Sequence, residues 1–274
     1  MSLPVTLKLS LMTFCMAVAS AAQAQPPCNA DLDGDGYVGQ TDLGVLLAAY
    51  GNGAGGDLDN DGDTDQADLG ILLAAYDTYV TFDYGPIYDN AEAWQVGLES
   101  LGENGKLVLP EWKYLRIDRD LAAIRDFEPL LETETHSMSW PANQLLISRN
   151  DNGDLQEYYC LNDYYQVISE ENIFDNLYLL TFAGKSNIPA LAGIYSSLSA
   201  INYAEPNNIY GGSNYWVPEF LDNDIVRWDI DDGFMDCFDG CDCHRHYIFE
   251  TDLAGNVTLI FYEEYGYSWC DFGG

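Results

Sequence analysis

Positive charge is scarce in this chain. Its 274 residues include 10 Lys and Arg against 45 Asp and Glu, which gives a formal net charge of −35 at pH 7. A surface of this charge repels phosphate backbones, so we exclude nucleic acid as a partner. Divalent cations are the partners that such a composition favours.

Long apolar runs are also lacking after the first residues. The segment "MSLPVTLKLSLMTFCMAVASAAQAQ" contains one apolar stretch, from about Leu9 to Ala19, that is too short for a good membrane span. Its ending, Ala22-Gln23-Ala24, fits the A-x-A pattern of a cleavage site. We therefore predict a signal peptide over residues 1–24, no membrane span, and a secreted, extracellular or cell-surface location. An uncleaved anchor is the alternative.

Free thiols are not expected either. Seven Cys become six when Cys15 leaves with the signal peptide, and an even number in an exported chain favours disulfides. The disulfide candidates are Cys28, Cys160, Cys237, Cys241, Cys243 and Cys270. The sequence does not choose among their possible pairings.

Residues 25–79 lack Lys, Arg and Glu altogether but contain eleven Asp, many of them in two acidic twelve-residue segments. "DLDGDGYVGQTD" begins at Asp31 and "DLDNDGDTDQAD" begins at Asp57. Both have Asp at positions 1, 3, 5 and 12 and Gly at position 6, the spacing of a calcium loop, in which position 7 donates a backbone carbonyl. The predicted ligands of two calcium ions are Asp31, Asp33, Asp35, Tyr37, Asp42, Asp57, Asp59, Asp61, Asp63 and Asp68.

A nearly identical apolar segment follows each loop. "LGVLLAAYG" begins at Leu43 and "LGILLAAYD" begins at Leu69, and both have apolar residues at helical spacing. Gly51 suits the end of the first helix. The two prolines between Gln25 and Asp31 leave no room for the entering helix of an ordinary EF-hand.

These duplicated loop-helix units closely resemble dockerins of type I, the calcium-dependent modules that attach secreted proteins to cohesin domains. The resemblance covers residues 28–79. It implies two helices packed antiparallel, two calcium ions, and a cohesin-like protein or cell-surface scaffold as partner. The family's partner contacts at loop positions 10 and 11 correspond to Gln40, Thr41, Gln66 and Ala67. A structural calcium module without such a partner, and an acidic linker, are the alternatives.

Residues 80–274 differ in composition, with mixed charges and all six Trp. "QLLISRNDNGDLQEYY" predicts two strands around a turn at Asn152-Gly153, and "HRHYIFETDLAGNVTLIFYEEYG" predicts a hairpin turning near Gly255. "LAAIRDFEPLLE" is a helix candidate. The predicted fold class is a small all-α EF-hand-like module followed by an α+β domain rich in antiparallel β.

The segment "NLYLLTFAGKSNIPALAGIYSSLSAINYAEPNNIY" predicts a strand at 177–182, a helix at about 189–199 and a strand at 201–204. Residues 177–207 resemble the C-terminal half of subtilisin-type propeptide inhibitor domains. The resemblance implies an extended tail from Glu205 that enters a protease cleft. A β-α-β unit reused only as a scaffold is the alternative.

"CFDGCDCHRH" gathers three Cys and two His within ten residues. We predict disulfides here. Zinc bound by His244, His246 and two thiolates, and a catalytic Cys-His pair, are the alternatives.

The sequence thus predicts an exported calcium-binding protein that docks through its acidic repeats and presents a binding or structural domain. A hydrolase of polysaccharides and a protease-inhibitor-like module are the alternatives, with glycans or proteases as partners. No catalytic residue is predicted, because 34 acidic residues after residue 79 make any carboxylate pair uninformative.

Overall fold

The computed structural model describes residues 30–33, 37–53, 55–59, 61–150, 153, 155–210, 214–235, 241–270 and 272. The predicted signal peptide, Cys28, Asp35 and Cys237 lie outside these ranges. Within them, no helix combines the length and the apolar character that crossing a bilayer requires.

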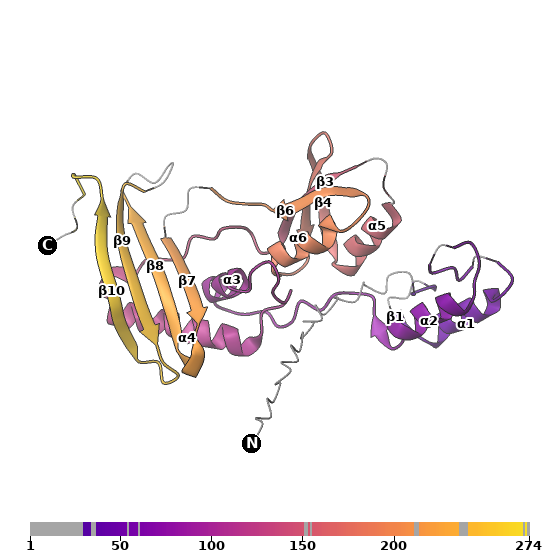
Figure 1. Ribbon diagram of the computed structural model, residues 1–274, viewed down its shortest axis with the longest axis horizontal. Coiled ribbons are helices and arrows are strands. Elements are labelled where there is room, and N and C mark those ends of the chain that lie inside the picture. Colours follow the sequence, from indigo (N-terminus) through magenta and orange to yellow (C-terminus); the bar gives the residue numbers. More distant parts are fainter. Residues whose placement is uncertain are drawn as a thin grey trace, which may run out of the picture.

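The N-terminal unit consists of two helices and two very short strands (Figure 1). Its elements are β1 (Tyr37–Val38), α1 (Gln40–Ala49), α2 (Gln66–Ala75) and β2 (Thr78–Tyr79). Leu46 of α1 and Leu72 of α2 are fully buried and form a small core with their neighbours. Gly51 follows α1 with a φ of +70°, the left-handed conformation expected at this helix end.

The predicted fold class is wrong in both parts. The N-terminal unit is not all-α, because β1 and β2 pair antiparallel, with Tyr37 opposite Tyr79 and Val38 opposite Thr78. Tyr, Val and Thr favour extended backbone, and Asp77, with a φ of +65°, turns the chain back after α2. The rest of the described chain is a mixed α/β structure, because its helices alternate with strands instead of being segregated from them.

Two four-stranded antiparallel sheets organise this second part. The first, in the order β4-β5-β3-β6, carries helices α5 and α6. Its elements are β3 (Gln144–Arg149), α5 (Leu155–Tyr164), β4 (Val167–Phe174), β5 (Leu177–Phe182), α6 (Ile188–Ser196) and β6 (Ile201–Pro206). This is a β-α-β-β-α-β arrangement of the ferredoxin-like kind. The predicted strand, helix and strand of residues 177–204 are confirmed as β5, α6 and β6.

The predicted strand after Gly153 is wrong, because the chain forms helix α5 there. Tyr158, Leu161 and Tyr165 recur at helical spacing and are almost fully buried against the rest of the core. The helical period of the apolar residues therefore outweighs the turn signal of the preceding Asn-Gly pair.

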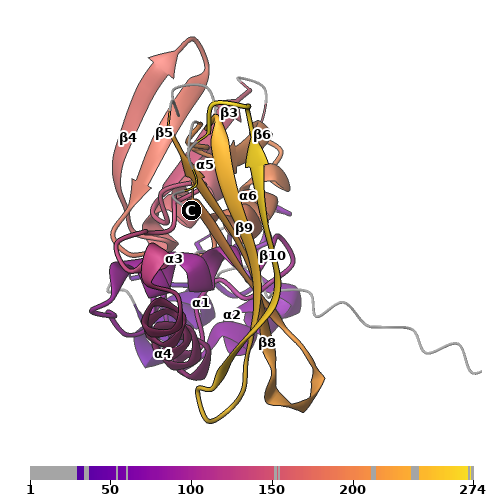
Figure 2. The ribbon, with the colours of Figure 1, turned by 90° about the vertical axis from the view of Figure 1, so that its left-hand side faces the viewer.

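The second sheet, in the order β10-β9-β8-β7, lies against helix α4 (Figure 1, Figure 2). The elements of this region are α3 (Ala91–Glu99), α4 (Glu111–Phe127), η1 (Pro129–Leu131), β7 (Asn214–Phe220), η2 (Asp222–Asp224), β8 (Val226–Phe234), β9 (Cys243–Thr251) and β10 (Val257–Gly266). The predicted hairpin is confirmed as β9 and β10. The predicted helix from Leu121 is confirmed in part: α4 begins earlier, at Glu111, and ends at Phe127, before the separate short helix η1.

Buried and partly exposed residues alternate along most of β9. Tyr247 and Phe249 point into the core beside Trp216 and Trp228, whereas His246 lies on the opposite face. The core of this sheet and the core of the first sheet form one cluster, separate from the small core of the N-terminal unit.

Candidate metal centre

The last aspartate of each acidic loop closes that loop in the same way. In the first loop, Asp42 Oδ1 accepts hydrogen bonds from Leu32 N at 2.7 Å and Asp33 N at 3.1 Å, and Asp42 Oδ2 accepts one from Gly39 N at 2.7 Å. Both loop ends are thereby fastened to the start of α1. Asp42 is buried, and these backbone N–H groups of its own loop hold its carboxylate in place.

The second loop repeats this closure. Asp68 Oδ1 accepts from Leu58 N at 2.6 Å and Asp59 N at 3.2 Å, and Asp68 Oδ2 accepts from Asp65 N at 2.7 Å. The two loops therefore agree in the bonds of position 12, to within about 0.1 Å.

Carboxylate oxygens converge in both loops. In the first loop, the ligand atoms of Asp31, Asp33 and Asp42 all lie within 4.8 Å of one another. In the second loop two such groups occur, one of Asp57, Asp59 and Asp61 and one of Asp63, Asp65 and Asp68. A donor set made only of carboxylate oxygens suits a hard dication such as calcium.

Asp65 was not among the predicted ligands. It caps helix α2, and its Oδ1 accepts a hydrogen bond from Ala67 N at 2.7 Å. Its carboxylate stands where the first loop has Gly39, so the acidic residue at position 9 is the sequence signal that could have identified it. Asp63 contributes a carboxylate to this group, whereas the sequence predicted only its backbone carbonyl.

Crowding of the carboxylates in the second loop raises the pKa of two of them. Desolvation and the charges of Asp61, Asp68 and Asp57 raise the pKa of Asp59, although a hydrogen bond from Asp61 N opposes this. The charge of Asp61 and desolvation likewise raise the pKa of Asp63. Repulsion of this kind disfavours the compact loop unless a cation neutralises it.

The closing carboxylates behave in the opposite way. Backbone hydrogen bonds from Asp65, Leu58 and Asp59 lower the pKa of Asp68 despite desolvation. Desolvation raises the pKa of Asp42, but its backbone hydrogen bonds outweigh this and leave the pKa below the ordinary value. Both carboxylates are therefore held in the ionised form that metal binding requires.

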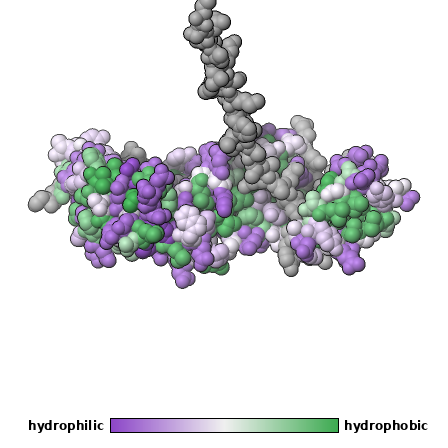
Figure 3. Space-filling view, turned by 60° about the horizontal axis from the view of Figure 1, so that its bottom comes forward, coloured by the Kyte–Doolittle hydropathy of each residue, from purple (hydrophilic) through white to green (hydrophobic). Residues whose placement is uncertain are grey.

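The four predicted partner-binding residues are exposed at the beginnings of the two helices. Gln40 and Thr41 open α1, and Gln66 and Ala67 occupy the same places in α2. Of the predicted apolar positions on the helices, only Leu46 and Leu72 are fully buried. The remaining apolar side chains leave an apolar patch on the N-terminal unit, at the right-hand end of Figure 3.

Equivalent residues of the two sequence repeats form this apolar patch. Leu47 and Leu73, at equivalent positions, are 52% and 54% exposed, and the equivalent Tyr50 and Tyr76 are exposed as well. One apolar face of each helix therefore stays available to a partner, while the other face is used in the core.

The Cys-His segment provides disulfides instead of a zinc site. Cys243 is joined to Cys270, and Cys160 and Cys241 are disulfide-bonded too. A sulfur in a disulfide is not a thiolate, so Cys241 and Cys243 do not offer the ligands that the zinc alternative requires. The metal-ligand groups among the described residues consist of Asp alone.

Both His of this segment are engaged by carboxylates. His244 Nδ1 lies 2.9 Å from Asp231 Oδ1, and His246 Nε2 lies 2.8 Å from Asp229 Oδ1. His244 also stacks on the ring of Tyr265, with 4.7 Å between ring centroids. These contacts tie β9 to its neighbours β8 and β10 on the outer face of the sheet.

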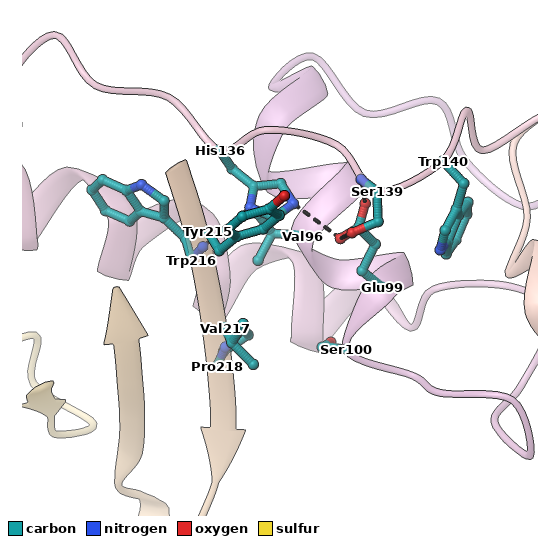
Figure 4. A pocket seen from close by; sticks show the side chains of 10 residues that line it. All are labelled: Val96, Glu99, Ser100, His136, Ser139, Trp140, Tyr215, Trp216, Val217 and Pro218. Carbon is teal, nitrogen blue, oxygen red and sulfur yellow. Dashed lines mark hydrogen bonds and ion pairs between the residues drawn. The ribbon is translucent and has the colours of Figure 1, made fainter. Parts of the chain in front are cut away.

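A cavity of about 220 Å³ lies between α3, the segment that leads to Trp140, and β7 (Figure 4). Glu99 is its central polar group. Glu99 Oε1 accepts from Gln95 Nε2 at 2.8 Å and Ser139 N at 2.9 Å, and Glu99 Oε2 meets Ser139 Oγ and His136 Nε2 at 3.0 Å each. The sequence did not predict this cluster, because its members lie far apart along the chain.

The geometry of this cluster does not suit a serine nucleophile. Trp216 N donates to His136 Nδ1 at 3.1 Å, so a neutral imidazole carries its proton on Nε2. That N–H then donates a hydrogen bond to Glu99. No lone pair of His136 is left to accept a proton from Ser139. Burial raises the pKa of Glu99, but hydrogen bonds from His136, Gln95 and Ser139 more than offset it, so the carboxyl stays ionised.

The extended tail expected from Glu205 is not free in this structure. Glu205 and Pro206 belong to β6, and Ile209 N then donates to Ser139 O at 2.8 Å on the way to β7.

Comparisons with protein-family models, with curated proteins and with solved structures returned no match to this chain.

Proposed function

We propose that residues 28–79 are a calcium-dependent docking module of the dockerin kind in an exported protein. Its partner is a cohesin-like domain or a scaffold on the cell surface. The remaining residues form the binding or structural domain that this docking presents.

The repeated closure of the two loops carries the calcium proposal. Asp42 and Asp68 make equivalent hydrogen bonds in loops whose other carboxylates converge on one another. A linker that is merely acidic has no reason to repeat bonds in this way. Oxygen ligands at alternate positions, with Gly62 at a φ of +103° where the loop turns, support calcium as the ion.

Calcium and folding should be coupled in this module. Its small core rests on Leu46 and Leu72 and a few neighbours, whereas eleven Asp repel one another without a compensating Lys or Arg. In the full-length protein, we expect titration calorimetry to give two calcium ions per chain. EDTA should lower the helical circular dichroism signal and excess calcium should restore it; an unchanged signal would refute the coupling.

Variants separate the two loops. Asp57→Ala should reduce the calcium stoichiometry from two to one, because it removes position 1 of the second loop. Asp175→Asn, in the turn between β4 and β5, is the matched control and should leave two ions bound.

The apolar patch on α1 and α2 supports the docking part of the proposal. The double variant Leu47→Ala/Leu73→Ala should abolish calcium-dependent binding to a panel of recombinant cohesin domains while both calcium ions still bind. Leu115→Ala, which removes an exposed Leu from α4, is the control. If no cohesin binds in the presence of calcium, the module is a structural one.

A protease-inhibitor-like function of residues 144–206 is a second candidate. The β-α-β-β-α-β arrangement with the strand order β4-β5-β3-β6 supports it. Titration against subtilisin-like proteases tests this candidate, and the absence of inhibition at micromolar concentrations would remove it. A glycan array and a hydrolase screen test the alternative of a polysaccharide-degrading enzyme.

A further inference from the structure

The two edges of the sheet β10-β9-β8-β7 differ in whether other described segments of the chain cover them. At the β7 edge, Ser137 N donates to Asn214 O at 2.6 Å, and Trp216 N donates to His136 Nδ1 at 3.1 Å. Pro218 removes one more backbone donor from that strand. The β7 edge is therefore capped.

The β10 edge is open among the described residues, since β9 is the only strand paired with β10. Figure 1 shows β10 as the outermost strand of its sheet. The chain after β10 returns toward β9 instead of covering the edge, because Tyr267 N donates to Asp242 O and Cys270 is joined to Cys243. The pairing with β9 shifts between Leu259 and Phe261, and the regular stretch from Phe261 onward offers its backbone groups to another strand.

The side chains of β10 are exposed along almost its whole length. Nine of its ten residues are exposed, and they include an apolar run in the middle of the strand. The exposed apolar residues of β10 are Leu259, Ile260, Phe261, Tyr262 and Tyr265. Natural edge strands of soluble proteins are usually short, charged or covered, so this run is unusual for an edge that stays in water.

The register places an apolar and an acidic side chain next to each other on each face of this edge. Phe261 and Glu263 stand opposite Ile248 and His246, on the outer face of the sheet. Tyr262 and Glu264 stand opposite Tyr247 and Arg245, on the face toward the core. An added strand would thus meet first an aromatic ring and then a carboxylate on either face.

A second copy of the chain is a poor occupant of this edge. Each copy carries a formal net charge of −35, and pairing two β10 strands would bring four carboxylates, those of Glu263 and Glu264 in each copy, into one ribbon. A strand with basic residues beside these carboxylates would instead be attracted.

We propose that β10 is a docking edge for an extended basic segment of a partner protein, which adds to the sheet as a fifth strand. Apolar residues of that segment pack beside Phe261 and Tyr262, and its Lys or Arg residues pair with Glu263 and Glu264. Backbone hydrogen bonds provide affinity, and a pair of apolar residues beside a pair of basic residues provides selectivity. This interaction does not depend on calcium and is separate from the docking module.

A synthetic peptide tests the proposal on the full-length protein with calcium present. The probe is a labelled, capped peptide of eight residues with two central lysines and three valines on each side, and fluorescence anisotropy measures its binding. A second peptide of the same sequence, N-methylated at alternate residues, keeps the charges but loses one hydrogen-bonding edge. We expect it to bind at least tenfold more weakly. Equal binding would reduce the interaction to unspecific charge attraction and overturn the proposal.

Protein variants locate the site. Glu263→Lys/Glu264→Lys should weaken binding of the unmethylated peptide at least tenfold. Glu219→Lys/Asp222→Lys, a charge reversal of the same size at β7 of the same sheet and at the adjoining η2, should leave it unchanged. If both variants weaken binding equally, the net charge of the protein and not the edge is responsible, and the proposal fails.

Hydrogen exchange of the unmodified protein provides a readout that does not depend on how the variants fold. The peptide should protect backbone amides of β10, and protection confined to other elements would overturn the proposal. Sedimentation of the protein alone should show no self-association through this edge. A dimer that the double charge reversal dissociates would show that a second copy is the occupant.

Discussion

Asp120 of helix α4 is a fully buried carboxylate with two guanidinium partners. Asp120 Oδ2 lies 2.8 Å from Arg116 Nε and accepts from Thr251 Oγ1 at 2.6 Å, and Asp120 Oδ1 lies 2.7 Å from Arg119 Nη2. The same arginines donate to the backbone carbonyls of Thr251 and Asp252. This network fastens α4 to the end of β9.

We predict that Asp120→Ala lowers the free energy of unfolding of the second domain by about 3–5 kcal/mol. The substitution leaves the guanidinium of Arg116, whose side chain is 10% exposed, without its counter-charge in the interior, and breaking a buried ion pair has a cost of this size. At about 2–4 °C of melting temperature per kcal/mol for a domain of this size, the midpoint should fall by at least about 6 °C.

Urea denaturation followed by tryptophan fluorescence measures this change, because all six Trp lie in the second domain. Asp126→Ala, which removes an exposed carboxylate from the same helix, is the matched control and should change stability by less than about 0.5 kcal/mol. A loss below about 1 kcal/mol for Asp120→Ala, or the same loss for both variants, would refute the reasoning.

Three further predictions concern other parts of the chain. The pKa of Glu99 is lowered in the folded protein, so its contribution to stability is present above the ordinary carboxyl pKa and is lost as pH falls through the folded value; Glu99→Gln should flatten the acid limb of a stability-pH profile. Cys243→Ser should lower the free energy of unfolding by about 2–4 kcal/mol relative to the oxidised parent protein in urea denaturation, since the lost disulfide joins residues 27 positions apart. Leu72→Ala should cost about 2–5 kcal/mol in calcium-loaded protein because this side chain is fully buried, whereas Leu73→Ala, 54% exposed, should cost little in thermal melts.

Local patterns in the sequence predicted the parts of the fold that local interactions define. The hairpin around Gly255 and the helix that begins near Pro189 both have turn or capping residues next to a clear apolar period. The loop-helix units were found because their sequence is repeated. In each case the deciding residues lie within a few positions of the element that they specify.

The elements that were missed depend on contacts between distant residues. Strand β1 is only two residues long and exists because Tyr79 returns beside Tyr37, about forty residues later. The cluster around Glu99 joins α3 to His136 and to the backbone of Trp216. No pattern within a short window of the sequence predicts such contacts. Asp65 is different, because its place at position 9 of the second loop is visible in the sequence.

The linker between the N-terminal unit and the second domain is very short. Val80 packs against the first core and Phe82 against the second, where its N–H donates to Tyr164 O at 2.7 Å, so exposed Thr81 alone lies between them. Tension on an anchored N-terminal unit would therefore pass to the second domain through one residue and would load the short β1–β2 pair directly. The mechanical strength of the attachment then depends on this pair and on the first acidic loop, within which β1 lies.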